Sequence, residues 1–250
     1  ASGVSFTPDG TLALVGNRTE GTVSIFAIAG KTVTPAGKVD LNAPDSGPSH
    51  VAVTPDGRTA LVTRNNDSLI SLLTIAGAKV EYAKRDLAAG FKPYSIEISS
   101  AGDVAVVGHT GAGPSGGADT VALIDLRANP PRTVDQLSVG PTVEGVALSP
   151  DGRSVAATVM NGSNSPPGSP FFHDFGLVKI LGIRNGKFTP ITEARVGHWC
   201  QGAAWSKDSR TLLVQCMTEN EIQVFGFDGS RLTPAAAIKV SASPAGIRAA

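Results

Sequence analysis

Phe6-Thr7-Pro8-Asp9-Gly10 is the first of three closely related segments in this chain. Val53-Thr54-Pro55-Asp56-Gly57 and Leu148-Ser149-Pro150-Asp151-Gly152 are the others, and weaker copies stand at 98–103 and 205–209. Measured at the proline position (8, 55, 101, 150 and 207), successive copies are 47, 46, 49 and 57 residues apart. A period near 47 residues is typical of one β-propeller blade rather than of a helical repeat.

Each segment has the residues of a tight turn between two strands. Proline presets the backbone dihedral, aspartate hydrogen-bonds to its own backbone, and glycine accepts positive φ. In the first unit we expect strands ending at Phe6 and covering 11–15, 22–28 and about 38–41. Four short strands per unit predict an antiparallel blade. Three aspartates are therefore interpreted as turn formers rather than as metal ligands or catalytic groups: Asp9, Asp56 and Asp151.

The predicted fold is all-β, a β-propeller of about five four-stranded antiparallel blades in a single domain covering residues 1–250. The repeats are expected at about 1–48, 49–93, 94–142, 143–199 and 200–244. The high content of turn formers, 29 Gly and 17 Pro in 250 residues, agrees with many short strands. Because the chain opens inside a strand pattern and without Met, we expect that further residues precede Ala1 in the parent protein.

Charge and hydropathy exclude two classes of partner. The 21 basic residues balance 21 acidic ones, so no basic stripe is available to neutralise the phosphates of a nucleic acid. No stretch approaches the roughly 20 apolar residues that a membrane helix needs.

Two loops after second strands are longer than the others, at 110–118 and 161–174, and both are expected on the same face of the ring. The first contains Gly111-Ala112-Gly113-Pro114-Ser115-Gly116. This matches GxGxxG, but Pro114 interrupts it and a strand pattern follows instead of a helix. A dinucleotide site is therefore not expected, and we interpret the segment as a loop.

The repeat resembles a known family. Leu14-Val15-Gly16-Asn17 and Thr22-Val23-Ser24-Ile25-Phe26, after the Pro-Asp-Gly turn, are similar to the repeats of the YVTN-type and lactonase-like seven-bladed propellers. The resemblance covers essentially the whole chain and implies a ring of seven blades, of which this chain supplies about five. It also implies a periplasmic or secreted protein, and in lactonase-like members a central His, Glu and Arg cluster.

A functional site is expected where the loops before first strands and after second strands share one face of the ring. Four chemically varied residues lie near the axis there: His50, Tyr94, Glu144 and Gln201. His50, Glu144 and Arg64 are the candidate catalytic set, and the candidate ligand-binding residues are Arg18, Tyr94, His109, His173, His198, Trp199 and Gln201.

Each of these residues also has a structural explanation. His50 and His198 can cap inner strands, Glu144 can be a solvated partner of an arginine, and Trp199 can seal a blade interface. The histidines lack the spacing of a zinc set, and no Cys-x-x-Cys-His is present, so no metal or other cofactor is expected.

The two cysteines lie eight residues on either side of Asp208, the centre of the fifth turn. Cys200 and Cys216 are therefore expected to oppose each other across a hairpin, where they can form a disulfide or remain as buried thiols. A disulfide would agree with an exported protein.

Two functions follow as hypotheses. One is an exported scaffold that binds a small molecule or a protein partner on the face bearing the 110–118 and 161–174 loops. The other is a hydrolase that opens a small lactone, with Glu144 or His50 as general base and Arg64 at the oxyanion.

Overall fold

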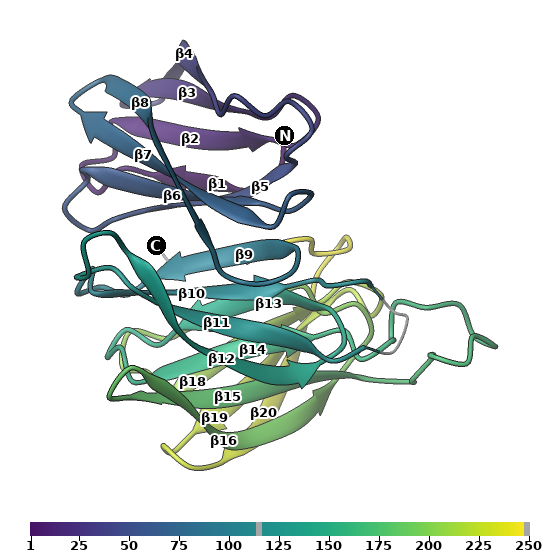
Figure 1. Ribbon diagram of the computed structural model, residues 1–250. Coiled ribbons are helices and arrows are strands. Elements are labelled where there is room, and N and C mark those ends of the chain that lie inside the picture. The colour runs from purple at the N-terminus through teal and green to yellow at the C-terminus, as the bar shows by residue number, and fades with distance from the viewer. Residues whose placement is uncertain (114–116, 248–250) are drawn as a thin grey trace.

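Five four-stranded antiparallel sheets form the part of the chain that the structure, a computed structural model, describes: residues 1–113 and 117–247 (Figure 1). In each sheet consecutive strands are neighbours, so every sheet is a meander of hairpins. The predicted all-β propeller with about five blades is confirmed. No membrane-crossing helix occurs in the described part of the chain.

The blades follow chain order. Blade 1 contains β1 (Val4–Phe6), β2 (Leu12–Asn17), β3 (Thr22–Ala29) and β4 (Thr32–Asp40). Blade 2 contains β5 (Pro48–Val53), β6 (Thr59–Arg64), β7 (Leu69–Ala76) and β8 (Lys79–Ala88). Blade 3 contains β9 (Pro93–Ile98), β10 (Val104–His109), β11 (Asp119–Asp125) and β12 (Arg132–Gly140). Blade 4 contains β13 (Val143–Leu148), β14 (Ser154–Val159), β15 (Gly176–Arg184) and β16 (Lys187–Val196). Blade 5 contains β17 (Gly202–Trp205), β18 (Thr211–Cys216), β19 (Glu221–Phe227) and β20 (Leu232–Lys239).

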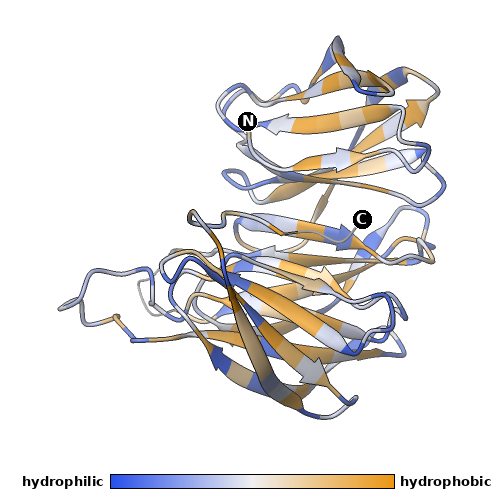
Figure 2. Ribbon diagram, turned by 180° about the vertical axis from the view of Figure 1, so that it is seen from behind, coloured by the Kyte–Doolittle hydropathy of each residue, from blue (hydrophilic) through white to orange (hydrophobic). Residues whose placement is uncertain are grey.

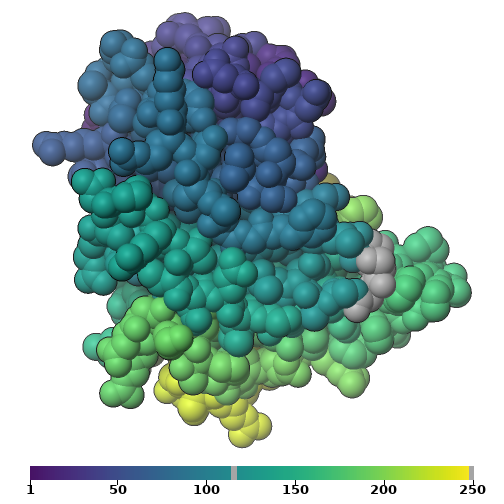
Figure 3. All heavy atoms as spheres, viewed as in Figure 1, coloured from purple at the N-terminus to yellow at the C-terminus, as the bar shows by residue number. Residues whose placement is uncertain are grey.

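The first strands of successive blades, β1, β5, β9, β13 and β17, lie side by side around the axis. Blades 1 and 5 lie at opposite ends of the resulting arc, as the purple and yellow ends of the chain show in Figures 1 and 3. The loop between β14 and β15 projects from the body on the side where second strands end (Figure 3).

The core is divided among the interfaces between blades. Leu14 and Ile25 of blade 1 pack with Val62 and Leu73 of blade 2, and three similar clusters join the later blades. Apolar residues accordingly follow the middles of the strands, with hydrophilic residues at the turns (Figure 2). All six residues of β10 and of β14 are buried, so the second strands are covered on both faces.

The outer strand of blade 1 is longer than expected. β4 spans Thr32–Asp40, whereas the sequence pattern places this strand only at about 38–41. Its side chains are mostly exposed and therefore lack an apolar signature, and the register shifts next to Pro35.

The Pro-Asp-Gly segments are turns in the structure. The Asp9 carboxylate accepts hydrogen bonds from Thr7 Oγ1 at 2.6 Å and from the Thr11 backbone N–H at 3.0 Å, while Gly10 has φ of 69°. These bonds to the carboxylate hold the pKa of Asp9 below its usual range. Asp56 and Asp151 make the same pair of contacts in blades 2 and 4, which accounts for all three aspartates as turn formers.

The glycine-rich loop of blade 3 leads into a strand, β11, as its sequence predicts. Pro114, Ser115 and Gly116 of the GxGxxG segment lie outside the described residues.

The structure joins Cys200 and Cys216 in a disulfide, with their Cα atoms 4.1 Å apart. Both residues are buried in the interface with blade 4, in contact with the cluster that contains Trp205. The bond closes the hairpin of β17 and β18, whose two cysteines are separated by 16 residues in the chain. It therefore links the segment just before β17 to the end of β18.

Replacing both cysteines by alanine should lower the free energy of unfolding by about 3 kcal/mol, because the unfolded chain gains the entropy of an open loop of this length. Equilibrium urea unfolding of the oxidised wild type and of the C200A/C216A variant measures the difference. Equal unfolding free energies would show that the bond is absent or without effect.

Candidate functional site

Five polar or aromatic side chains, one from each blade, meet on the face where second strands end and the next blade begins. We call them the axial cluster: Arg18, His50, Tyr94, Glu144 and Gln201. His50, Tyr94 and Glu144 belong to the first strands β5, β9 and β13, Gln201 directly precedes β17, and Arg18 lies between β2 and β3. The stacking of inner strands around the axis brings these positions together.

Blades 1 to 3 contribute one half of the axial cluster. The rings of His50 and Tyr94 are tilted against each other with centroids 4.9 Å apart. The Arg18 guanidinium lies over the Tyr94 ring, 5.8 Å from its centroid, and Arg18 Nη2 donates to Asn65 Oδ1 at 2.9 Å. A cation at this distance from an aromatic face is attracted to it, so Arg18 is positioned from two sides.

Blades 4 and 5 contribute the other half. Gln201 Nε2 donates to Glu144 Oε2 at 2.7 Å. Burial raises the pKa of Glu144, and the bond from Gln201 and the charge of Arg18 offset part of that rise. The pKa of Tyr94 is raised by its burial and by the nearby charge of Glu144, while Arg18 opposes this effect. Tyr94, Glu144 and Arg18 therefore interact electrostatically in one partly dehydrated space.

A buried threonine holds this geometry. Thr63 Oγ1 donates to the Tyr94 backbone carbonyl at 2.7 Å and accepts from the His50 backbone N–H at 2.9 Å, which links β5 to β9. Gly3 leaves the room that His50 needs, because a Cβ at position 3 would lie 2.6 Å from His50 Cδ2. Neither role is visible in the sequence, where Thr63 is one residue of a strand and Gly3 precedes the first turn.

Three solved structures resemble this architecture over nearly the whole chain. Hydrazine synthase from Kuenenia stuttgartiensis matches with a TM-score of 0.77 and 18% identity, over 98% of this chain and 76% of that one. A 6-phosphogluconolactonase candidate from Bacteroides fragilis matches with a TM-score of 0.76 and 19% identity, over 97% and 71%. The periplasmic gluconolactonase of Pseudomonas aeruginosa matches with a TM-score of 0.71 and 17% identity, over 96% and 70%.

The chain has the fold of the lactonase-like β-propellers. No family model matches its sequence, and no curated protein matches it either. At these low identities the similarity concerns the fold, so the chemistry of this propeller has to be argued from its own side chains.

Arg64 lies outside the axial cluster. Its side chain is buried at the end of β6, where it pairs with Asp67, with Asp86 Oδ2 at 3.0 Å, and with Ser71 Oγ at 3.2 Å. These partners connect the end of β6 to β7 and β8 within blade 2. The arginine that faces Tyr94 is Arg18.

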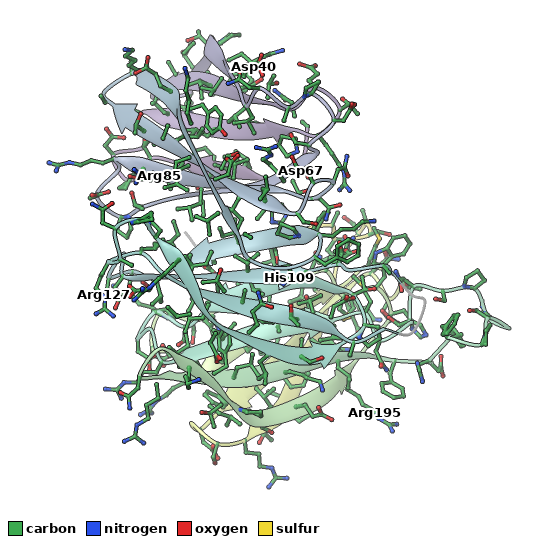
Figure 4. All side chains as sticks on the ribbon, viewed as in Figure 1. Asp40, Asp67, Arg85, His109, Arg127 and Arg195 are labelled. Atoms are coloured by element: carbon green, nitrogen blue, oxygen red, sulfur yellow. A yellow bond between two sulfur atoms is a disulfide. The ribbon has the colours of Figure 1, made fainter. Side chains whose placement is uncertain are left out.

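Two of the predicted histidines have structural partners in this propeller. His109 is 1% exposed, its Nδ1 lies 2.7 Å from the Thr120 carbonyl oxygen, and burial lowers its pKa (Figure 4). His173 Nδ1 lies 2.8 Å from the Asn161 carbonyl oxygen, at the base of the loop between β14 and β15.

His198 connects two blades. Its Nδ1 lies 2.6 Å from Glu219 Oε1 and its Nε2 lies 2.9 Å from Asp174 Oδ1, so one imidazole bridges carboxylates of blade 5 and of the 161–174 loop. The bond to Glu219 is the main cause of a raised pKa at His198, the bond to Asp174 adds to it, and burial opposes both. Phe172 stacks over the same ring at 6.4 Å. Trp199, 39% exposed, follows directly.

No group of three or more His, Cys, Asp or Glu side chains able to hold a metal ion is found among residues 1–113 and 117–247.

Replacing His198 by glutamine should loosen the 161–174 loop. Exposed ion pairs of this kind contribute about 0.2–1 kcal/mol each, so loss of both pairs should accelerate amide exchange in the loop about two- to thirtyfold. Hydrogen exchange measured by mass spectrometry reports on this segment directly.

Because the imidazolium form of His198 binds both carboxylates and its pKa is raised, the wild-type loop should lose protection as the pH rises through that pKa. Equal exchange in both proteins would contradict the bridging role.

Proposed function

We propose that the axial cluster is a hydrolytic site that opens the ring of a small lactone. The observation that carries the proposal is Glu144, a buried carboxylate with a raised pKa, held by Gln201 beside the charge of Arg18. A base whose pKa is raised is suited to activating water, and an adjacent guanidinium can stabilise the negative charge of an oxyanion. Two of the similar structures described above are a 6-phosphogluconolactonase candidate and a periplasmic gluconolactonase, which supports lactones as the substrate class.

In the proposed reaction Glu144, as a carboxylate, accepts a proton from a water molecule while the water oxygen bonds to the lactone carbonyl carbon. The carbonyl electron pair moves onto its oxygen, where Arg18 stabilises the charge. When this intermediate collapses, the bond from the carbonyl carbon to the ring oxygen breaks. The proton held by Glu144 passes to that oxygen, directly or through His50, and the product is an open-chain hydroxy acid.

Arg18 takes the place that the sequence hypothesis gave to Arg64. The charge of Arg64 is already opposed by close ion pairs with Asp67 and Asp86, whereas the direct contacts of Arg18 are an amide and an aromatic ring, and Glu144 acts on it only at longer range. An arginine without a close ion pair retains more of its field for a developing negative charge.

A second candidate is binding without chemistry, as a scaffold for a small molecule or a protein partner. Phe171 is 41% exposed and Trp199 is 39% exposed, and both belong to the side that carries the 161–174 loop. Exposed aromatic side chains of this size are typical of binding surfaces.

We also infer that the protein acts in an oxidising compartment, as a periplasmic or secreted protein. The Cys200–Cys216 disulfide supports this location, and so does the similarity to a periplasmic gluconolactonase.

The hydrolase proposal predicts that E144Q lowers kcat for δ-gluconolactone or 6-phosphogluconolactone by about 10²–10⁴-fold, because the general base is lost. R18Q should lower it by about 10²–10³-fold through loss of the oxyanion contact. K92Q is the matched control, since it removes a positive charge outside the axial cluster and should leave kcat unchanged. Rates are measured with spontaneous hydrolysis subtracted. Wild-type rates equal to the spontaneous rate for all lactones tested would favour the binding function.

The pH dependence of kcat/KM should show an acid limb that follows Glu144. The carboxylate form is the base, and its pKa is raised, so activity should fall at a pH above the usual carboxyl range as the pH decreases. Because the charge of Arg18 lowers the pKa of Glu144, the residual activity of R18Q should show the limb at still higher pH. An acid limb in the ordinary carboxyl range, or one unmoved by R18Q, would exclude Glu144 as the base.

A further inference from the structure

A groove of about 630 Å³ lies between blades 2 and 3, on the opposite side of the molecule from the axial cluster. The turn residues Pro55 and Asp56 of blade 2 and Ala101 and Gly102 of blade 3 form part of its wall. Since these turns connect first to second strands, the groove opens on the face away from the 161–174 loop. It shares no residue with the proposed hydrolytic site.

The groove depends on a hairpin connection that is special to blade 3. Residues 126–131 join β11 to β12, whereas the corresponding connections of blades 1, 2 and 4 are residues 30–31, 77–78 and 185–186. Leu126, Arg127, Ala128, Asn129 and Pro131 of this longer connection line the groove. The connection is longer than those of the other four blades, of which that of blade 5 covers residues 228–231, and the extra residues give blade 3 an additional wall.

The apolar surface of the groove comes from Ala83 of blade 2, which is exposed, and from Leu126 and Pro131 of blade 3, which are half-buried. Leu61, Leu72 and Leu73 lie behind this surface and are buried. Such a surface favours a ligand with an apolar body, because the apolar area that it covers is removed from water.

Two arginines line the same groove, one from each blade. Arg85 belongs to β8 and has no ion-pair partner among the residues that the structure describes. Arg127 approaches Asp103 only at 3.9 Å and Asp125 at 3.5 Å with its side chain 71% exposed, and pairs of this kind contribute little. Figure 4 labels both arginines on the same side of the molecule.

One carboxylate, Asp56, also lines the groove. Its Oδ1 accepts hydrogen bonds from Thr54 Oγ1 at 2.6 Å and from the Arg58 backbone N–H at 3.0 Å, so this oxygen is occupied within its own turn. The charge of Asp56 is therefore partly compensated locally, and the remaining charge of the groove is positive.

We propose that this groove is a ligand site for a small anionic amphiphile, a molecule with a flat apolar body and one carboxylate or sulfonate group. The apolar body packs against Ala83, Leu126 and Pro131, and the anionic group binds Arg85, with Arg127 as the second cation. The volume is in the range of about 300–1,000 Å³ that is usual for small-molecule sites. The site is independent of lactone hydrolysis.

The experiment uses two fluorescent probes with the same aromatic body. 1-Anilinonaphthalene-8-sulfonate carries the anionic group, and N-phenyl-1-naphthylamine lacks it. We expect saturable binding of one sulfonate probe per chain, weakened about fivefold or more in R85Q and to a smaller degree in R127Q. The neutral probe should bind more weakly and equally to the wild type and R85Q.

Two further variants locate the binding. K84Q removes a positive charge from the same strand outside the groove and should leave the affinity for the sulfonate unchanged. A83W places a bulky ring at an exposed strand position that lines the groove, and should abolish saturable binding while the urea unfolding curve stays that of the wild type. If the sulfonate binds R85Q and A83W as tightly as the wild type, or does not bind the wild type, the proposal is wrong.

Discussion

The mutual burial of blade faces is the interaction on which the rest of the structure depends. A four-stranded sheet of this composition has two apolar faces, and each is removed from water only when another blade covers it. Leu14 and Ile25 are buried against Val62 and Leu73 for this reason, and the fully buried strands β10 and β14 repeat the pattern further along the chain. The packing fixes the inner strands relative to one another. Side chains at the starts of those strands therefore converge on the axis although about 50 residues separate them in the chain.

The inner strand of blade 1 carries apolar side chains that are exposed. Val4 is 40% exposed and Phe6 is 57% exposed on β1, and they stand 47 positions before Val51 and Val53. In blade 2, Val51 is fully buried in the cluster shared with blade 1, and Val53 packs against that cluster. The exposed face of blade 1 thus has the composition of a blade interface.

Much of the architecture could be predicted because the turns are chemically explicit. A proline, an aspartate and a glycine at fixed spacing specify each corner, and the structure shows Asp9 in the bonding expected of it. The axial positions of His50, Tyr94, Glu144 and Gln201 follow from the same repeat. The sequence could not predict which arginine would lie beside Tyr94, because Arg64 is held away from it by an ion pair with the nearby Asp67 and by one with Asp86 on another strand. The extent of β4 was also missed, since an exposed outer strand has no apolar signature.

The axial cluster places a carboxylate where burial disfavours its charge, and such sites are commonly functional rather than stabilising. The most direct test is a crystal structure of the protein with a lactam analogue of δ-gluconolactone, which the site cannot hydrolyse by the proposed ring opening. The account predicts the lactam carbonyl oxygen within about 3 Å of the Arg18 guanidinium and a water molecule between Glu144 and the carbonyl carbon. A lactam bound away from the axial cluster, or no lactam bound at saturating concentration, would contradict the assignment of this site.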